Sequence, residues 1–360
     1  MTRVFISDCE GPISKNDNAF ELTSHFVPDG GKLFTVISRY DDVLADVVKK
    51  AGYRAGDTLK LVLPFLKAYG VTDEKMRGFS REHLLLISNA KVSLKYVKSV
   101  APVFIVSTSY EHYIRALCQA LDFPYENTYC TKVNIDEYGM TKQEVQALKQ
   151  IAREIARMPI IEIPYGANSL NDLSDDDQRV VRRLDEIFWK EISSSVCRRM
   201  FSEVNPVGGK EKAEAISDVT KRLGVTVTGV MYVGDSITDE KALRLVKEND
   251  GLAVSFNGNP YAIENAEIAI LSETSLTTAV VADAFCRFGK QQTLRLVKNW
   301  NRETLKESQI DQSLLNQLFK VYPRELPKVK IVTSENMQTL AKESNDFRKK
   351  VRGEAIGRLG

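Results

Sequence analysis

The chain has 360 residues, of which 43% are hydrophobic and 27% are charged, the balance of an ordinary soluble globular protein. Its formal net charge is only +2, so no overall positive field indicates a nucleic acid partner. No stretch approaches about 18 uncharged apolar residues, so we expect no membrane span. Five scattered cysteines without a CxxC pair argue against a disulfide framework and a structural zinc site, and predict a reducing, cytoplasmic location.

Short, continuous apolar runs rich in β-branched or aromatic residues predict strands that are buried on both faces of a parallel sheet. These runs occupy residues 4–6, 103–106 and 230–233, and a probable further strand occupies 252–255. Amphipathic helical patterns alternate with the strands, at residues 110–121, 210–223 and 238–248. We therefore expect an α/β fold built on a doubly wound parallel sheet.

The segments between these runs predict additional helical parts. We expect the core to consist of residues 1–12, 101–141 and 203–282. Residues 13–100 are too long for an ordinary crossover and predict a helical cap over the crevice. Residues 142–202 predict a helical insert with a break at 159–175, and residues 283–360 a mostly helical C-terminal extension without recognisable chemistry.

Polar residues follow each of the first three predicted strands. Asp8 comes after the first strand, Ser107 after the second and Asp235 after the third. Ligands of open α/β sheets bind beyond the carboxyl ends of the strands, so we expect these three residues to converge on one crevice.

This set of residues suits the hydrolysis of a phosphate monoester. A carboxylate such as Asp8 can act as a nucleophile and form an aspartyl phosphate. Because carboxylate and phosphate repel each other, a divalent cation must lie between them, and Mg²⁺ prefers one or two carboxylates together with phosphate and water. Asp8 and Asp235 are the candidate carboxylates, and Asp239 can reach back to the metal or to its waters.

Further groups are needed for protons and for the phosphate. Glu10 is placed to act as general acid and base. The Ser107 hydroxyl and the backbone N–H of Thr108, expected at the start of a helix, can bind phosphoryl oxygens. Lys210 and Lys212 are candidates for the neutralising cation.

Two residues, Asn257 and Asp17, each allow two interpretations. Asn257 lines the phosphate end of the crevice or belongs to a plain turn. Asp17, at the entry to the predicted cap, is most simply a helix cap.

The pattern Asp8-Cys9-Glu10-Gly11-Pro12, then Ser107, Lys212 and Gly234-Asp235-Ser236-Ile237-Thr238-Asp239, resembles the four ordered motifs of the haloacid dehalogenase (HAD) superfamily. It is most similar to the phosphoserine-phosphatase-like members and to uncharacterised archaeal proteins of the superfamily. The resemblance implies a Rossmann-like core with a cap. It also implies that Asp8, Asp235 and the backbone carbonyl of Glu10 bind magnesium, and that Ser107 and Lys212 hold the phosphate. For Asp17 it implies the second interpretation, a substrate-reading acid. Most such phosphatases carry aspartate at the position of Glu10.

The leading hypothesis is a cytoplasmic, magnesium-dependent phosphomonoester hydrolase that acts on a small phosphorylated metabolite. A second hypothesis is a non-catalytic accessory protein of a larger complex such as a hydrogenase, which the resemblance to archaeal proteins suggests. A third is a phosphotransferase or mutase. The sequence does not determine the substrate or the oligomeric state.

Overall fold

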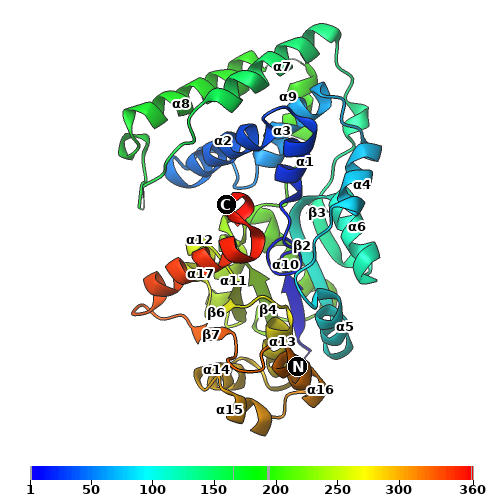
Figure 1. The fold of residues 1–360 in the computed structure, drawn as a ribbon, viewed down its shortest axis with the longest axis vertical. Helices are drawn as coiled ribbons and strands as arrows, with labels where there is room; N and C mark the ends of the chain where they lie inside the picture. Colours follow the sequence, from blue (N-terminus) through cyan, green and yellow to red (C-terminus); the bar gives the residue numbers. More distant parts are fainter. Residues whose placement is uncertain (1, 165, 193–194, 358, 360) are drawn as a thin grey trace.

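The computed structural model describes residues 2–164, 166–192, 195–357 and 359. In this part of the chain, seven strands form one sheet in the order β3-β2-β1-β4-β5-β6-β7 (Figure 1). The strands are β1 (Val4–Ser7), β2 (Val103–Tyr110), β3 (Thr128–Thr131), β4 (Val230–Gly234), β5 (Leu252–Phe256), β6 (Ile268–Leu271) and β7 (Lys328–Ile331). All neighbours pair in parallel except β6 and β7, which are antiparallel. The doubly wound α/β core is therefore confirmed.

The apolar strands are buried because helices cover both faces of the sheet. Alternate residues of β1 illustrate this: Phe5 packs into the apolar cluster on one face, whereas Val4 and Ile6 pack into the cluster on the other. The helices of the first face are α5 (Ala90–Val100), α6 (Glu111–Leu121), α13 (Leu276–Phe288) and α16 (Gln312–Val321). Those of the second face are α10 (Gly209–Leu223), α11 (Glu240–Glu248) and α12 (Pro260–Asn265).

The predicted cap and the predicted insert share one apolar cluster. The cap helices are α1 (Asn18–Phe26), α2 (Gly30–Asp42), α3 (Thr58–Ala68) and α4 (Asp73–Glu82), and a π-helical turn (Val43–Val47) continues α2. The insert helices are α7 (Lys142–Arg157), α8 (Asp175–Glu186) and α9 (Ser195–Glu203). Figure 1 shows α1, α2 and α3 with the insert helices above the sheet, whereas α4 lies beside α6. The Tyr40 hydroxyl of α2 donates a hydrogen bond of 2.6 Å to Asp185 of α8.

Two segments lie elsewhere than the sequence predicts. Helix α5 was expected in the cap, but its Ala90, Leu94 and Val97 pack with α13 on the sheet. The strand β7 lies in the extension that was expected to be mostly helical, and it adds an antiparallel edge to the sheet. The cap boundary at residue 100 is therefore too late, because α5 buries its apolar face against the core.

The rest of the C-terminal extension wraps around the sheet. Its other helices are α14 (Lys290–Lys298), α15 (Arg302–Glu307), α17 (Met337–Arg352) and α18 (Glu354–Gly357). After β7 the chain returns along α17, and α18, at the red end of the ribbon, lies between the cap helices and the core (Figure 1). Leu359 packs into the apolar cluster of the cap. The extension therefore joins the two parts of the molecule.

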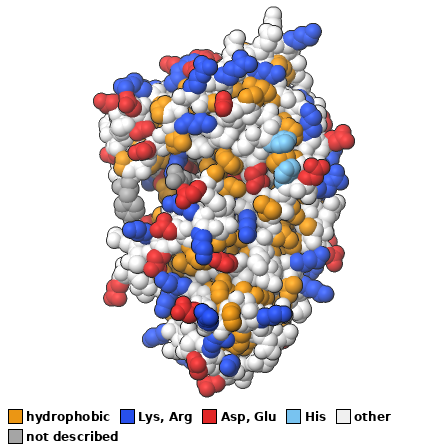
Figure 2. Space-filling model, viewed as in Figure 1, with side chains coloured by type: hydrophobic (Ala, Val, Ile, Leu, Met, Phe, Trp, Pro, Cys, Tyr) orange, Lys and Arg blue, Asp and Glu red, His pale blue; other side chains and the backbone are white. Residues whose placement is uncertain are grey.

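The surface agrees with the small net charge. Figure 2 shows basic and acidic side chains interspersed over one face of the molecule. Within the described ranges, every helix falls short of the length and apolar character that crossing a bilayer requires.

Candidate active site

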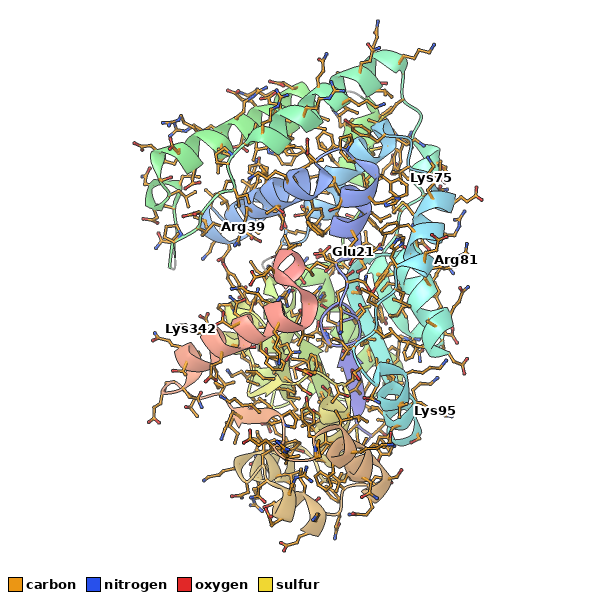
Figure 3. All side chains as sticks on the ribbon, viewed as in Figure 1. Glu21, Arg39, Lys75, Arg81, Lys95 and Lys342 are labelled. Atoms are coloured by element: carbon orange, nitrogen blue, oxygen red, sulfur yellow. The ribbon has the colours of Figure 1, made fainter. Side chains whose placement is uncertain are left out.

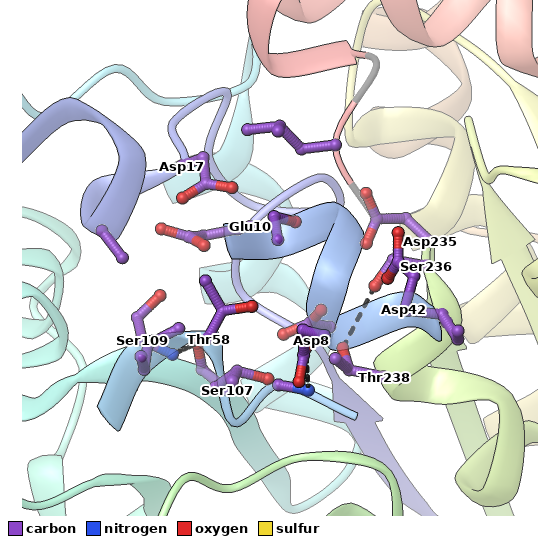
Figure 4. Close-up of a pocket in the computed structure, with 18 of the residues that line it drawn as sticks. Asp8, Glu10, Asp17, Asp42, Thr58, Ser107, Ser109, Asp235, Ser236 and Thr238 are labelled. Carbon is purple, nitrogen blue, oxygen red and sulfur yellow. Dashed lines mark hydrogen bonds between the residues drawn. The ribbon is translucent and has the colours of Figure 1, made fainter. Parts of the chain in front are cut away.

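A cavity of about 100 Å³ lies where the core, the cap and the C-terminal segment meet. From the core it is lined by Asp8, Glu10, Ser107 and Asp235 (Figure 4). Cap residues such as Asp17 and Asp42 line it from the opposite side, and α17 contributes Arg348 and Arg352. The three residues predicted to converge do so, because the parallel strands end at the same edge of the sheet. Asp8 and Asp235 directly follow β1 and β4, whereas Ser107 lies in the second half of β2.

The loop after β1 places Asp8 and Glu10. The backbone N–H of Asp8 donates to the Val233 carbonyl of β4 at 2.8 Å, which continues the sheet for one residue. The chain then turns tightly at Gly11, whose φ is +105°, a conformation that favours glycine. A β-carbon at Gly11 would lie 2.2 Å from Oδ2 of Asp235, so the missing side chain also lets Asp235 approach.

The turn after β4 is held by Asp239. Its Oδ2 accepts hydrogen bonds from the backbone N–H groups of Asp235 and Ser236, at 3.0 and 3.1 Å. Its Oδ1 accepts from the Tyr232 hydroxyl at 2.6 Å and lies 2.8 Å from Nζ of Lys212. Both oxygens of Asp239 therefore already have partners, which favours a role in positioning Asp235 and Lys212.

Lys212 is the lysine of the site. Its side chain is fully buried, and Nζ lies 2.9 Å from Oδ2 of Asp8 and 2.8 Å from Oδ1 of Asp239. Lys210, two residues earlier, is exposed and pairs with Glu214 at 2.9 Å. Helix α10 places Lys212 on its buried face and Lys210 on its solvent face, which separates the two candidates.

Burial controls the charges of the core carboxyl groups. It raises the pKa of Asp8 to about 8, with Asp239 acting in the same direction and Lys212 opposing both. Burial also opposes ionisation of Asp239, but Lys212 and the hydrogen bonds around it hold the pKa of Asp239 below its ordinary value.

Glu10 and Asp17 face each other in the cavity (Figure 4). Burial and the neighbouring Asp17 raise the pKa of Glu10 well above its ordinary value, although Oε1 accepts a 2.7 Å hydrogen bond from the Asn18 backbone. Asp17 is the N-cap of α1, and its side chain accepts from the Phe20 N–H at 3.0 Å. Asp17 is therefore the helix cap that was expected, and it also lines the cavity, while its role in reading a substrate stays a prediction.

The predicted phosphate-binding residues are only partly brought together. Ser107 is buried beside the cavity, and its Oγ accepts from the Ser109 N–H at 3.2 Å. Thr108 also lines the cavity, but it lies inside β2, because α6 begins only at Glu111. The expectation that its N–H belongs to a helix start is wrong.

Asn257 is buried away from this cavity. Its side-chain amide donates to the Ser272 carbonyl at 2.8 Å, and its Oδ1 accepts from the Ser272 N–H at 2.9 Å. Its φ of +49° fits the turn interpretation, so the structure does not bring Asn257 to the phosphate end of the crevice.

Three carboxylates could hold a metal ion. Asp8, Asp235 and Asp239 each offer an oxygen, and these oxygens lie within 4.8 Å of one another. Hard oxygen donors of this kind suit Mg²⁺. Asp239 accepts several hydrogen bonds besides its ion pair with Lys212, whereas among the described residues the Asp8 side chain has only the Cys9 N–H at Oδ1 and Lys212 at Oδ2. Asp8 and Asp235 are therefore the better candidates for direct ligands.

Sequence reasoning missed two arginines. Arg348 and Arg352, one turn apart on α17, have buried side chains that both pair with Oδ2 of Asp235; for Arg352 the distance is 3.0 Å. Arg352 also donates to the carbonyls of Lys15 and Asn16, which anchors α17 to the loop after β1. In the sequence they look like solvent-facing residues of a charged helix, and no local signal marks them.

Comparison with known proteins shows a close structural likeness. No family model matches the chain, and no curated protein matches it. The fold is similar to that of an archaeal gene product from Archaeoglobus fulgidus, with 27% identity and a TM-score of 0.80 over 100% of this chain and 99% of that one.

Weaker likenesses link the chain to phosphoserine phosphatase structures. The apo form has 13% identity and a TM-score of 0.40, covering 76% of this chain and 96% of that one. A phospho-aspartyl intermediate analogue has 12% identity and a TM-score of 0.43, covering 74% and 92%. Values this low support no conclusion about the activity of this chain.

Proposed function

We propose that this chain is a magnesium-dependent phosphomonoester hydrolase of the HAD type, acting on a small phosphorylated compound through an aspartyl phosphate on Asp8. The observation that carries the proposal is the buried cluster of Asp8, Asp235 and Asp239 at the carboxyl ends of adjacent parallel strands, in which Lys212 pairs with Asp8 and Asp239. Such a cluster costs several kcal/mol to bury, which favours a role in chemistry over one in stability.

The residues have distinct roles in this proposal. Asp8 attacks phosphorus through a carboxylate oxygen, while Lys212 and the Ser107 hydroxyl bind phosphoryl oxygens. Bound at Asp8 and Asp235, Mg²⁺ would offset the repulsion between carboxylate and phosphate. Burial and the neighbouring Asp17 raise the pKa of Glu10, which favours its protonated form, so Glu10 can donate a proton to the leaving oxygen. The resulting carboxylate can then accept a proton from the water that hydrolyses the aspartyl phosphate.

Hydrolysis of p-nitrophenyl phosphate by the full-length chain tests this function. We expect turnover that requires Mg²⁺ and that falls at least a hundredfold in Asp8→Asn and in Lys212→Met. Lys210→Met is the matched control, because Lys210 is exposed on the same helix, and its rate should stay within twofold of wild type. No turnover on this compound or on a panel of phosphorylated metabolites, by protein that binds Mg²⁺, would refute the proposal.

One observation favours the second candidate, a non-catalytic accessory protein. Two guanidinium groups already occupy Oδ2 of Asp235, and the cavity of about 100 Å³ is small. Calorimetric titration with Mg²⁺ separates the candidates. Failure to bind Mg²⁺ at millimolar concentration would favour the accessory role.

A further inference from the structure

The C-terminal helix α17 places a pair of arginines inside the candidate active site. The guanidinium groups of Arg348 and Arg352 both line the cavity that Asp8 and Ser107 also line. Both side chains are 4% exposed. The outer side of the same helix carries Lys342, which is exposed (Figure 3). Burying two guanidinium groups is costly unless each has anionic partners, so their position calls for an explanation.

Asp235 accounts for only part of this requirement. One carboxylate oxygen serves both arginines, and the remaining contacts are backbone carbonyls. Nε of Arg348 is buried and has no acceptor in the described part of the chain. An unpaired guanidinium N–H beside the cavity indicates a missing acceptor, and a phosphoryl group offers several.

The charges of the ion-paired groups also favour a phosphoryl group as the missing acceptor. When Asp8 is ionised, as metal binding and nucleophilic attack require, the three aspartates carry three negative charges and the three paired cations carry three positive ones, so the paired set is neutral. Adding a divalent cation gives +2, and adding a phosphomonoester dianion restores neutrality. Without the arginines the same assembly would carry −2 in a buried site, which is unfavourable.

We propose that Arg348 and Arg352 bind the phosphoryl group of the substrate, and that Asp235 is their partner only while the site is empty. This inference rests on the proposed function. It adds two residues of the C-terminal extension to the phosphate-binding set, alongside Ser107 and Lys212. The planar guanidinium fork suits bidentate contact with phosphoryl oxygens, which a lysine at either position would not reproduce.

Calorimetry with inorganic phosphate tests the inference without requiring turnover. The full-length chain is titrated with phosphate in saturating Mg²⁺, and separately with Mg²⁺ alone. In Arg352→Gln we expect the phosphate Kd to rise at least tenfold while Mg²⁺ binds as tightly as in wild type or more tightly. Lys350→Gln is the matched control on the same helix, since Lys350 is exposed and pairs with Glu273; both affinities should stay within twofold.

Other outcomes overturn the inference. If Arg352→Gln lowers the Kd for Mg²⁺ but leaves the Kd for phosphate within threefold of wild type, the arginines only neutralise Asp235. If Arg352→Gln does not fold, Arg352→Lys keeps the charge without the fork, and a phosphate Kd unchanged from wild type would count against the inference equally. Absence of phosphate binding by the wild type refutes it as well. The hydrolase function, by contrast, would be refuted by protein that binds phosphate but does not turn over p-nitrophenyl phosphate.

Discussion

Buried carboxyl groups occur in the cap as well as among the core residues of the site. Asp41 of α2 lines the cavity and is 4% exposed, and its Oδ2 accepts a 2.9 Å hydrogen bond from the Gly56 backbone. Burial raises the pKa of Asp41 to about 7, and the neighbouring Asp42 adds to the shift. The hydrogen bond from Gly56 fixes the loop before α3 beside the cavity. Ionising the buried Asp41 carboxyl group lowers the free energy of unfolding, and this loss depends on pH.

Replacing Asp41 by asparagine should reveal that cost. Because the folded-state pKa lies above the unfolded value of 3.8, the folded protein binds more protons between about pH 4 and 7, and stability falls as the pH rises through this window. Asparagine cannot ionise, yet it still offers an acceptor to Gly56. In urea unfolding, Asp41→Asn should raise the free energy of unfolding relative to wild type. We expect this increase to be about 2 to 3 kcal/mol larger at pH 8 than at pH 5. An equal difference at both pH values would show that Asp41 ionises freely in the folded protein.

At the scale of single elements, the loop after β1 depends on Gly11. The loop must turn within a few residues, and it must leave room for the Asp235 carboxylate. Gly52 provides a comparison within the same chain. It also has a positive φ, of +77°, but an added β-carbon there would meet nothing within 4 Å.

The two glycines should respond differently to alanine. Gly52→Ala should cost about 1 kcal/mol from backbone strain alone. Gly11→Ala adds a clash with Asp235, so we expect a loss of unfolding free energy at least about 2 kcal/mol greater, together with weaker Mg²⁺ binding. Thermal unfolding and calorimetry measure the two effects. Equal destabilisation by both substitutions would mean that the Gly11 turn can move away from Asp235.

At the scale of the whole molecule, the cap and the insert behave as one body. Although α2 and α7 lie about a hundred residues apart in sequence, they pack side by side in a single apolar cluster. Ile155 of α7 is fully buried in it. The same cluster includes Leu359, so the C-terminal segment that carries the arginines is tied to the cap as well as to the core.

Truncating a buried side chain of α7 should therefore destabilise the cap helices as well. Ile155→Ala should cost about 2 to 5 kcal/mol. Hydrogen exchange should then accelerate in α2 and α3 as well as in α7, while β1 and β4 stay protected, because cooperative units open together. Gln146→Ala, at an exposed position of α7, is the control and should leave exchange unchanged. Faster exchange confined to α7–α9 would show that the insert is an independent unit.

The sequence by itself determined the core of the sheet and the first half of the site. Continuous apolar runs predict β1, β2, β4 and β5 because strands buried on both faces admit few polar residues. Asp8 and Asp235 follow two of these runs directly, and the common edge of a parallel sheet brings them together. The residues alone left Lys210 and Lys212 open, and only the family resemblance favoured Lys212.

Only the tertiary structure decided the partners of the remaining elements. Local patterns give a helix its apolar face but not the surface that covers it, so α5 could not be assigned to the sheet rather than to the cap. The strand β7 was missed because only Val329 of its four residues is buried, between the exposed Lys328 and Lys330 of an edge strand. Asn257 forms hydrogen bonds with Ser272. Arg348 and Arg352 bind Asp235, from which more than a hundred residues of sequence separate them. Such contacts depend on how distant segments pack, a relation that spacing along the chain does not encode.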